Sequence, residues 1–160
     1  MKYVRPFSVI LAAAVICSAG CAQVGSTVDT DEGYFTEIRM SELEYRTFLA
    51  KKTSDILGML VSHAALAENI ADGECDKSIE INSVAVTIGA IERAYEDISG
   101  IGAASGCDMI REKLLDILDS TKEHIAGYKE MLSAKDSITK EEADEYASLF
   151  KNDHTALSAF

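Results

Sequence analysis

The chain contains no tryptophan, a single proline and few basic residues. The proline is Pro6, so the rest of the sequence lacks the residue that most readily breaks a helix. Fifteen lysines and arginines stand against 27 aspartates and glutamates, which gives a formal net charge of −12. This balance argues against nucleic acid as a partner, because such binding depends on basic side chains that neutralise phosphates. It also disfavours anionic lipid headgroups, so membrane contact would need a non-electrostatic anchor.

The sequence also lacks the spacings of several common catalytic and metal centres. Cys-x-x-Cys-His, Glu-x-x-His, His-Glu-x-x-His and Gly-x-Ser-x-Gly are all missing. These patterns would have indicated covalent haem, a di-iron site, a zinc protease and a serine hydrolase, respectively. The glycines at 100, 102 and 106 lack the lysine and the preceding strand of a phosphate-binding loop. We interpret them as a turn between helices, and we expect neither enzyme activity nor a resident cofactor or metal.

The composition that remains is that of a globular protein. A length of 160 residues suggests one domain, and 48% hydrophobic with 26% charged residues excludes a disordered chain. The first twenty residues are organised differently from the rest. Lys2 and Arg5 precede an apolar run from Phe7 to Ile16, and small residues follow. This is the layout of a secretory signal, and the run is shorter than the ~20 residues of a membrane-spanning helix.

A cysteine follows the small residues, and its position is informative. The stretch Ser18-Ala19-Gly20-Cys21 resembles the lipobox of bacterial lipoproteins, although an aliphatic residue is usual where Ser18 stands. The resemblance implies that Cys21 carries acyl chains such as palmitate, and that residues 1–20 are removed as a signal peptide. Cys17 is the competing position for lipidation, but Ile16 before it is too large for the small residue expected there. The alternatives are a signal without lipidation or an N-terminal anchor.

The resemblance further implies a place in the bacterial cell envelope. Ala22 after the cysteine is similar to the default residue for sorting to the outer membrane, on its periplasmic or outer face. Removal of residues 1–20 takes away Lys2 and Arg5, so 13 basic and 27 acidic residues give the mature chain a charge of −14. Residues 21–36 are polar and show no sustained period, which is typical of a flexible tether. Residues 37–160 form the expected folded domain.

Apolar residues in that domain recur at spacings of three and four, which predicts amphipathic helices over 41–72, 77–99 and 107–135 and from 139 onwards. Ser41 with Glu44, and Thr139 with Glu142, match capping boxes, and Ser105 with Asp108 is a further candidate cap. Gly73 is placed to end the first helix. The polar stretch 51–55 interrupts the first stripe and predicts a kink or break there. The second helix has the apolar stripe Ile81, Val84, Ile88, Ile91, Tyr95 and Ile98.

Helices joined by short connections are typical of antiparallel neighbours, and four apolar stripes can close one core. The sequence therefore predicts an all-α, up-down antiparallel bundle of about four helices, the first long or broken. His63 lies on the first stripe, where a histidine could ligate haem or a metal or could bond to a core neighbour. His124 and His154 are expected at or near the surface.

Cys75 and Cys107 remain after Cys21 is acylated, and the expected compartment is oxidising. We predict an intramolecular disulfide between them. Helix geometry opposes this pairing, because the roughly 24 residues of the second helix span about 36 Å and a disulfide needs Cα atoms within about 7 Å. Free thiols, or a bond between two protomers, are the other outcomes.

These features predict a lipid-anchored, acidic, helical module of the envelope that acts by binding. The expected partner is a basic envelope protein, because the field of a −14 chain attracts basic surfaces. The alternative function is a carrier of a small ligand or metal that uses the bundle core around His63.

Overall fold

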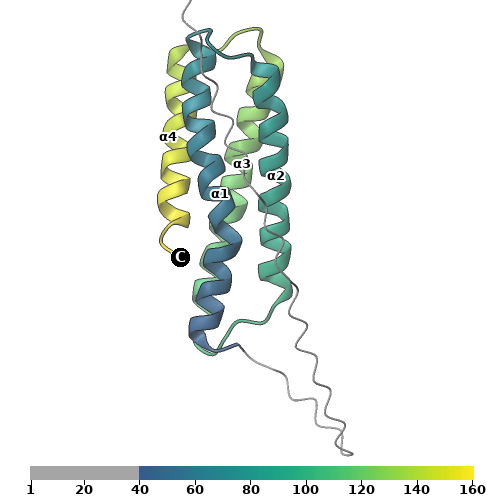
Figure 1. Ribbon diagram of the computed structural model, residues 1–160, viewed down its shortest axis with the longest axis vertical. Helices are drawn as coiled ribbons and strands as arrows, with labels where there is room; N and C mark the ends of the chain where they lie inside the picture. Colours follow the sequence, from purple (N-terminus) through teal and green to yellow (C-terminus); the bar gives the residue numbers. More distant parts are fainter. Residues whose placement is uncertain (1–39) are drawn as a thin grey trace, which may run out of the picture. The chain divides into compact units, whose positions relative to one another are not determined.

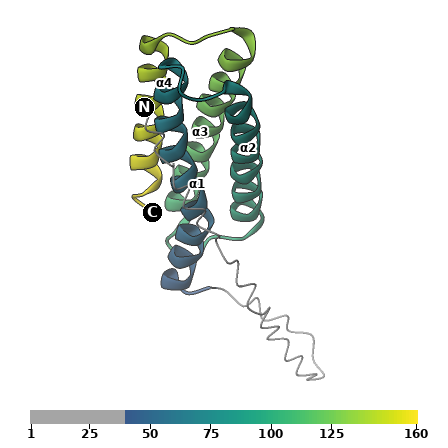
Figure 2. The same cartoon turned by 45° about the horizontal axis from the view of Figure 1, so that its top comes forward.

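The computed structural model of the protein describes residues 40–160. These residues fold into four α-helices and contain no strand, as Figures 1 and 2 show. The helices are α1 (Glu42–Ala71), α2 (Lys77–Gly100), α3 (Asp108–Ala134) and α4 (Lys140–Leu157). The predicted all-α fold with four helices is confirmed.

The helices pack in a ring in which each touches its two neighbours. α1 packs against α2 and α4, and α3 packs against the same two helices from the opposite corner. The connections α1–α2 and α3–α4 lie at one end of the bundle, and the α2–α3 connection lies at the other (Figure 1). The topology is therefore up-down-up-down, as predicted from the short connections.

Local chemistry accounts for both ends of α1. The Glu44 amide donates to the Ser41 hydroxyl, and the Glu44 carboxylate accepts from the Ser41 backbone N–H at 2.8 Å, so the predicted capping box is present. At the other end Gly73 has a φ of +73°, a left-handed conformation that favours glycine. Its N–H donates to the Ile70 carbonyl and the next N–H, of Glu74, donates to Asn69. This is a Schellman motif, which satisfies the last carbonyls of the helix.

The first helix was expected to kink or break at residues 51–55; α1 continues without a break for 30 residues. Thr53 provides the physical reason. It is buried in the core at 1% exposure, and its hydroxyl donates to the carbonyls of Leu49 and Ala50 on the preceding turn. A threonine whose hydroxyl is satisfied in this way can occupy an apolar stripe. The stripe that looked interrupted is therefore continuous.

The start of α3 differs from the prediction. Ser105 makes no cap; the N-cap is Cys107, which has no capping side-chain hydrogen bond. The thiol is instead buried at 1% exposure in the core. Arg111 in the first turn of α3 reaches across to α2, where its guanidinium donates to the carbonyls of Ile98 and Ser99. These two bonds satisfy carbonyls in the last turn of α2 and hold the ends of the two helices together.

The start of α4 follows the prediction closely. Thr139 and Glu142 form the second capping box, and Ile138 and Ala143 on either side of it are both buried. Aromatic rings then fill the core between α3 and α4. Tyr128 lies edge-on to Phe150, with ring centroids 5.2 Å apart, and Tyr146 lies 5.1 Å from Tyr128.

The buried line of α2 differs from the predicted stripe in a way that matters for function. Val84, Ile91 and Ile98 are buried as expected, but Tyr95 is exposed and Ile81 and Ile88 are only partly buried. The remaining core positions on α2 belong to Glu80, Thr87 and Ala94. Two polar residues therefore face the centre of the bundle where the sequence pattern predicted isoleucines.

Candidate functional site

A polar cluster lies in the core between α1 and α2. His63 on α1 is 1% exposed, Glu80 on α2 is 0% exposed and Thr87 is 1% exposed. The Nδ1 atom of His63 is 2.7 Å from Oε1 of Glu80, and its Nε2 atom is 2.7 Å from the hydroxyl of Thr87. Glu80 and Thr87 are seven residues apart, so they lie on the same side of α2, two turns from each other. The histidine side chain joins both of them.

Hydrogen-bond accounting assigns the protons of this cluster. The Thr87 hydroxyl donates to the Ser83 carbonyl at 3.2 Å, so it accepts a bond from Nε2–H of His63. Nδ1 of His63 and Oε1 of Glu80 then share one further proton. Whichever atom holds that proton, the pair has no net charge, which suits a site from which water is excluded.

Two polar atoms in the same region have no hydrogen-bond partner among the described residues. They are Oε2 of Glu80 and the hydroxyl of Tyr128 on α3. Burial raises the pKa of Tyr128 above its ordinary value, and the nearby charge of Glu80 raises it further. The phenol is therefore neutral, and its hydroxyl and Glu80 Oε2 are both buried without a hydrogen-bond partner among residues 40–160. This polar core cluster consists of His63, Glu80, Thr87 and Tyr128.

A second histidine pair joins α3 to α4 nearer the surface. Nδ1 of His124 is 2.9 Å from Oδ2 of Asp153. Desolvation raises the pKa of Asp153, and the hydrogen bond from His124 partly offsets this effect. His124 and His154 are both half-buried, which agrees with their predicted place near the surface. The pair fixes the register of two helices.

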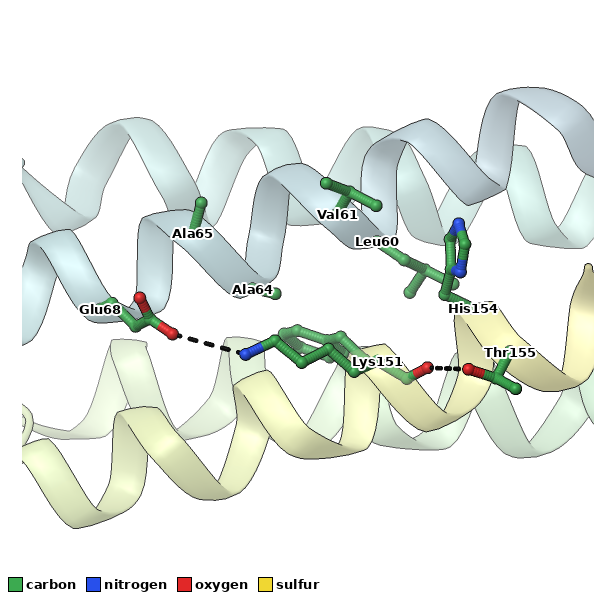
Figure 3. Close-up of a pocket in the computed structure, with 9 residues that line it drawn as sticks. Leu60, Val61, Ala64, Ala65, Glu68, Lys151, His154 and Thr155 are labelled. Carbon is green, nitrogen blue, oxygen red and sulfur yellow. Dashed lines mark hydrogen bonds and ion pairs between the residues drawn. The ribbon is translucent and has the colours of Figure 1, made fainter.

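A groove of about 410 Å³ lies between α1 and α4 and is shown in Figure 3. Its floor is apolar and includes Leu60, Ala64 and Phe150. Lys151 crosses the groove to Glu68, with 3.6 Å between Nζ and the carboxylate, and His154 stands at the other end. Such a groove can receive an apolar side chain, while its rim offers an acid, a base and an imidazole for hydrogen bonds.

The predicted site residues fall in different parts of the chain. Cys21 lies outside the described residues. His63 lies in the core and both of its ring nitrogens are hydrogen-bonded, so ligation of haem or a metal would require the loss of one of these bonds. Glu80, Thr87 and Tyr128 were not singled out from the sequence. The sequence signal for Glu80 and Thr87 was their seven-residue spacing, and Tyr128 lies on the apolar stripe of the third predicted helix.

The structure does not contain the expected disulfide between Cys75 and Cys107, and both are free thiols. Cys75 lies in the α1–α2 connection and Cys107 lies at the end of the α2–α3 connection, at opposite ends of α2 (Figure 1). At 1.5 Å per residue the 24 residues of α2 separate the two ends by about 36 Å. The connecting segments do not fold back along the helix, so no intramolecular bond can form.

Within residues 40–160, no group of three His, Cys, Asp or Glu side chains has an arrangement that could hold a metal ion. None of the four helices in this part of the chain combines the length and apolar character that a membrane span requires. Comparison of the chain with protein-family models, with curated proteins and with solved structures gave no match.

Proposed function

We propose that this protein is a lipid-anchored, non-catalytic binding module of the bacterial cell envelope, held by acyl chains on Cys21. The observation that supports the binding role is that the interior of the bundle is occupied by its own side chains. Apolar side chains fill the core, and its histidine bonds to Glu80 and Thr87 through both ring nitrogens. Recognition would then take place at the acidic surface, and a basic envelope protein is the partner that fits this charge.

The anchor is tested by labelling cells with radioactive palmitate. The wild-type protein is expected to carry label and to fractionate with the outer membrane, whereas Cys21→Ala loses the label. Cys17→Ala serves as the matched control, because it removes the competing cysteine and should leave labelling unchanged. Label that persists in Cys21→Ala contradicts the anchor.

The binding role is tested by chemical cross-linking in intact cells followed by purification under denaturing conditions. The expected product is a defined adduct with a basic envelope protein that disappears when the salt concentration is raised before cross-linking. Adducts that are unaffected by salt, or that form equally with acidic proteins, contradict a partner selected by charge.

The alternative function is a carrier that binds a small ligand or metal at the polar core cluster. The observation in its favour is that Glu80 Oε2 and the Tyr128 hydroxyl are buried without partners. Optical spectroscopy and metal analysis of the purified protein test it. A stoichiometric chromophore or metal that is lost in Glu80→Gln would favour the carrier over the binding module.

A further inference from the structure

The outer face shared by α1 and α2 carries a second pattern of residues, separate from the core stripe. On α1 the residues at 51, 55, 58, 62, 65 and 69 follow alternating spacings of four and three, so they form one line along the helix. On α2 the residues at 79, 83, 86, 90 and 93 do the same. Surface clefts between the two helices join the lines: Ser62 and Gly58 line one cleft with Ser83, and Lys51 lines the next with Arg93. We call these two lines together the α1–α2 face.

The middle of the α1–α2 face has no charge although the chain is strongly acidic. Residues 56–67 of α1 include no Asp, Glu, Lys or Arg, and neither do residues 81–91 of α2. Val86 is 60% exposed in this stretch, and Ile79, which precedes it on the same line of α2, is 64% exposed. Gly58 has no atom within 4 Å of the position of an added Cβ, so the helix surface beside it is open. Exposed isoleucine and valine on a charge-free surface are typical of a contact surface.

Charges return at the two ends of this face, and the ends have opposite character. Lys51 and Arg93 stand at the end near the α2–α3 connection, in a cleft that also contains Asp55 and the Lys52–Asp97 ion pair. Neither Lys51 nor Arg93 forms an ion pair with any residue from 40 to 160. Asp72, Glu74 and Asp76 stand at the other end, in the α1–α2 connection. Three basic against two acidic side chains give the first end a small positive excess, so the net charge changes sign along the face, across a neutral and partly apolar centre.

If a second copy of the face is turned end to end, the net charges of the two faces oppose each other at both ends. Lys51 lies eleven residues before Ser62, and Gly73 lies eleven residues after it. On α2, Ile79 and Arg93 lie seven residues either side of Val86. The bond from His63 to Thr87 sets the neighbouring residues Ser62 and Val86 at similar heights on the antiparallel helices. A two-fold axis through this level would bring Lys51 of one molecule, about 16 Å from the axis, over the acidic connection of the other, while Arg93 lies about 10 Å from the axis and stops short of that connection.

From this symmetry we infer that the α1–α2 face is a docking surface for a second copy of this chain, arranged antiparallel about a two-fold axis near Ser62 and Val86. Two acidic molecules repel each other, so they associate best through a face whose centre is uncharged and whose ends are complementary. A two-fold dimer uses the same patch on both partners, which is the commonest form of homo-oligomer. The inference goes beyond the proposed function and does not depend on the anchor or on a basic partner.

Disulfide trapping of the full-length protein in membranes tests the geometry. Ser62→Cys lies beside the axis and is expected to give a covalent dimer on oxidation with copper–phenanthroline. Ser148→Cys, on the exposed surface of α4, is the matched control and is expected to stay monomeric. All variants also carry Cys75→Ser. Equal trapping at the two positions, no trapping at Ser62→Cys, or trapping of a different protein identified by mass spectrometry overturns the inference.

A charge exchange tests the ends of the face independently. Lys51→Glu places an acid against the acidic connection of the second copy, and we expect the dimer to dissociate about tenfold more readily in sedimentation equilibrium. Adding Glu74→Lys restores the opposite charges and should recover the original affinity. Lys113→Glu, on exposed α3, controls for the change in net charge, and circular dichroism verifies the fold of each variant. A Lys51→Glu effect that the second change does not reverse, or that Lys113→Glu reproduces, overturns the pairing.

Discussion

At the scale of single residues, His63 and Glu80 each reduce the free-energy cost of burying the other in the core. A buried carboxylate without a partner is strongly destabilising, and so is a buried imidazole with free ring nitrogens. The 2.7 Å contact between them, together with the Thr87 hydroxyl, satisfies both nitrogens. Because α1 contributes the histidine and α2 contributes the other two residues, the cluster also selects one register between the helices.

The first prediction concerns this pair. His63→Leu should lower the free energy of unfolding by about 3–5 kcal/mol, because it leaves the carboxylate of Glu80 buried without its partner. The double variant His63→Leu/Glu80→Met replaces the pair by apolar side chains of similar volume and should recover most of that loss. Urea denaturation of the purified proteins measures both values.

Leu118→Met is the control for this experiment, since it changes a fully buried side chain of α3 without touching the pair. Its effect should stay below about 1.5 kcal/mol. If the effects of His63→Leu and Glu80→Met simply add in the double variant, the two residues are not coupled and the account of the cluster is wrong.

The sequence predicts the burial of some residues in this cluster but not of others. The burial of His63 followed from its place on the α1 stripe. The burial of Glu80 and Thr87 did not follow from the α2 pattern, because Ile81 and Ile88 next to them offered an equally regular apolar line. Choosing between the two lines requires knowledge of which side of α2 faces His63. That depends on the rotation of one helix against another, and a single sequence does not contain it.

At the scale of whole helices, local chemistry determined most boundaries. Capping boxes and the glycine after α1 act through atoms a few residues apart, so their sequence signals are specific. Two expectations failed for the same reason. Thr53 was interpreted as an interruption and Ser105 as a cap, because both are polar. Thr53 instead bonds to its own helix and lies in the core. The N-cap of α3 is the buried Cys107 and not Ser105.

The second prediction compares Gly58, inside α1, with Gly73, which follows the end of that helix. Gly73→Ala forces a side chain into a left-handed conformation with φ near +73°, and should lower the free energy of unfolding by about 1–2 kcal/mol. No atom lies within 4 Å of the added Cβ at either Gly73 or Gly58, so crowding plays no part. Gly58→Ala, inside the helix, should instead raise stability by about 0.5–1 kcal/mol. Thermal and urea unfolding measure the two changes, and effects of the same sign would contradict this explanation.

The third prediction concerns pH at the helix starts. The backbone N–H of Ser41 donates to Glu44 and lowers the pKa of that carboxyl group, while Lys135 and the backbone N–H of Thr139 do the same for Glu142. A carboxyl group whose pKa is lowered by folding contributes stability above its unfolded pKa, and this contribution is lost as pH falls through the folded pKa. The first turns of α1 and α4 should therefore fray as the pH falls through the acid range below the ordinary glutamate value of about 4.3.

Carbon NMR of the two carboxyl groups measures these titrations directly. Ser41→Gly is expected to move the Glu44 midpoint upwards, because it removes the side-chain partner and loosens the backbone donor. Glu44→Gln keeps a bond acceptor at this position without a titrating group, so fraying of α1 in that variant should no longer follow pH. A Glu44 midpoint equal to that of the unfolded chain would contradict the capping account.

At the scale of the whole molecule, the charge excess and the proposed anchor would act together. The chain has 27 acidic residues against 15 basic ones, and the acidic residues among 40–160 are exposed except for Glu80, Glu142 and Asp153. In the proposed arrangement the acyl group confines the domain to one membrane face, which raises its effective concentration for a partner at the same membrane. The acidic field then governs how often that partner meets the surface in a useful orientation.

The fourth prediction follows from this field and concerns the rate of association with the basic partner recovered by cross-linking. The association rate constant should fall steeply between 0.01 M and 0.15 M salt, because the screening length shortens from about 30 Å to about 8 Å over that range. The dissociation rate should change far less, since short-range contacts hold the formed complex. Stopped-flow or surface-based kinetics measure both rates.

The variant Glu141→Gln/Asp144→Asn/Glu145→Gln tests the source of this effect. It removes three acids from exposed α4 positions without altering the capping box of that helix. The variant should therefore associate more slowly than the wild type at low salt and match it at high salt. A rate that does not respond to salt in either protein would mean that the acidic surface keeps the molecule soluble and does not guide a partner to it.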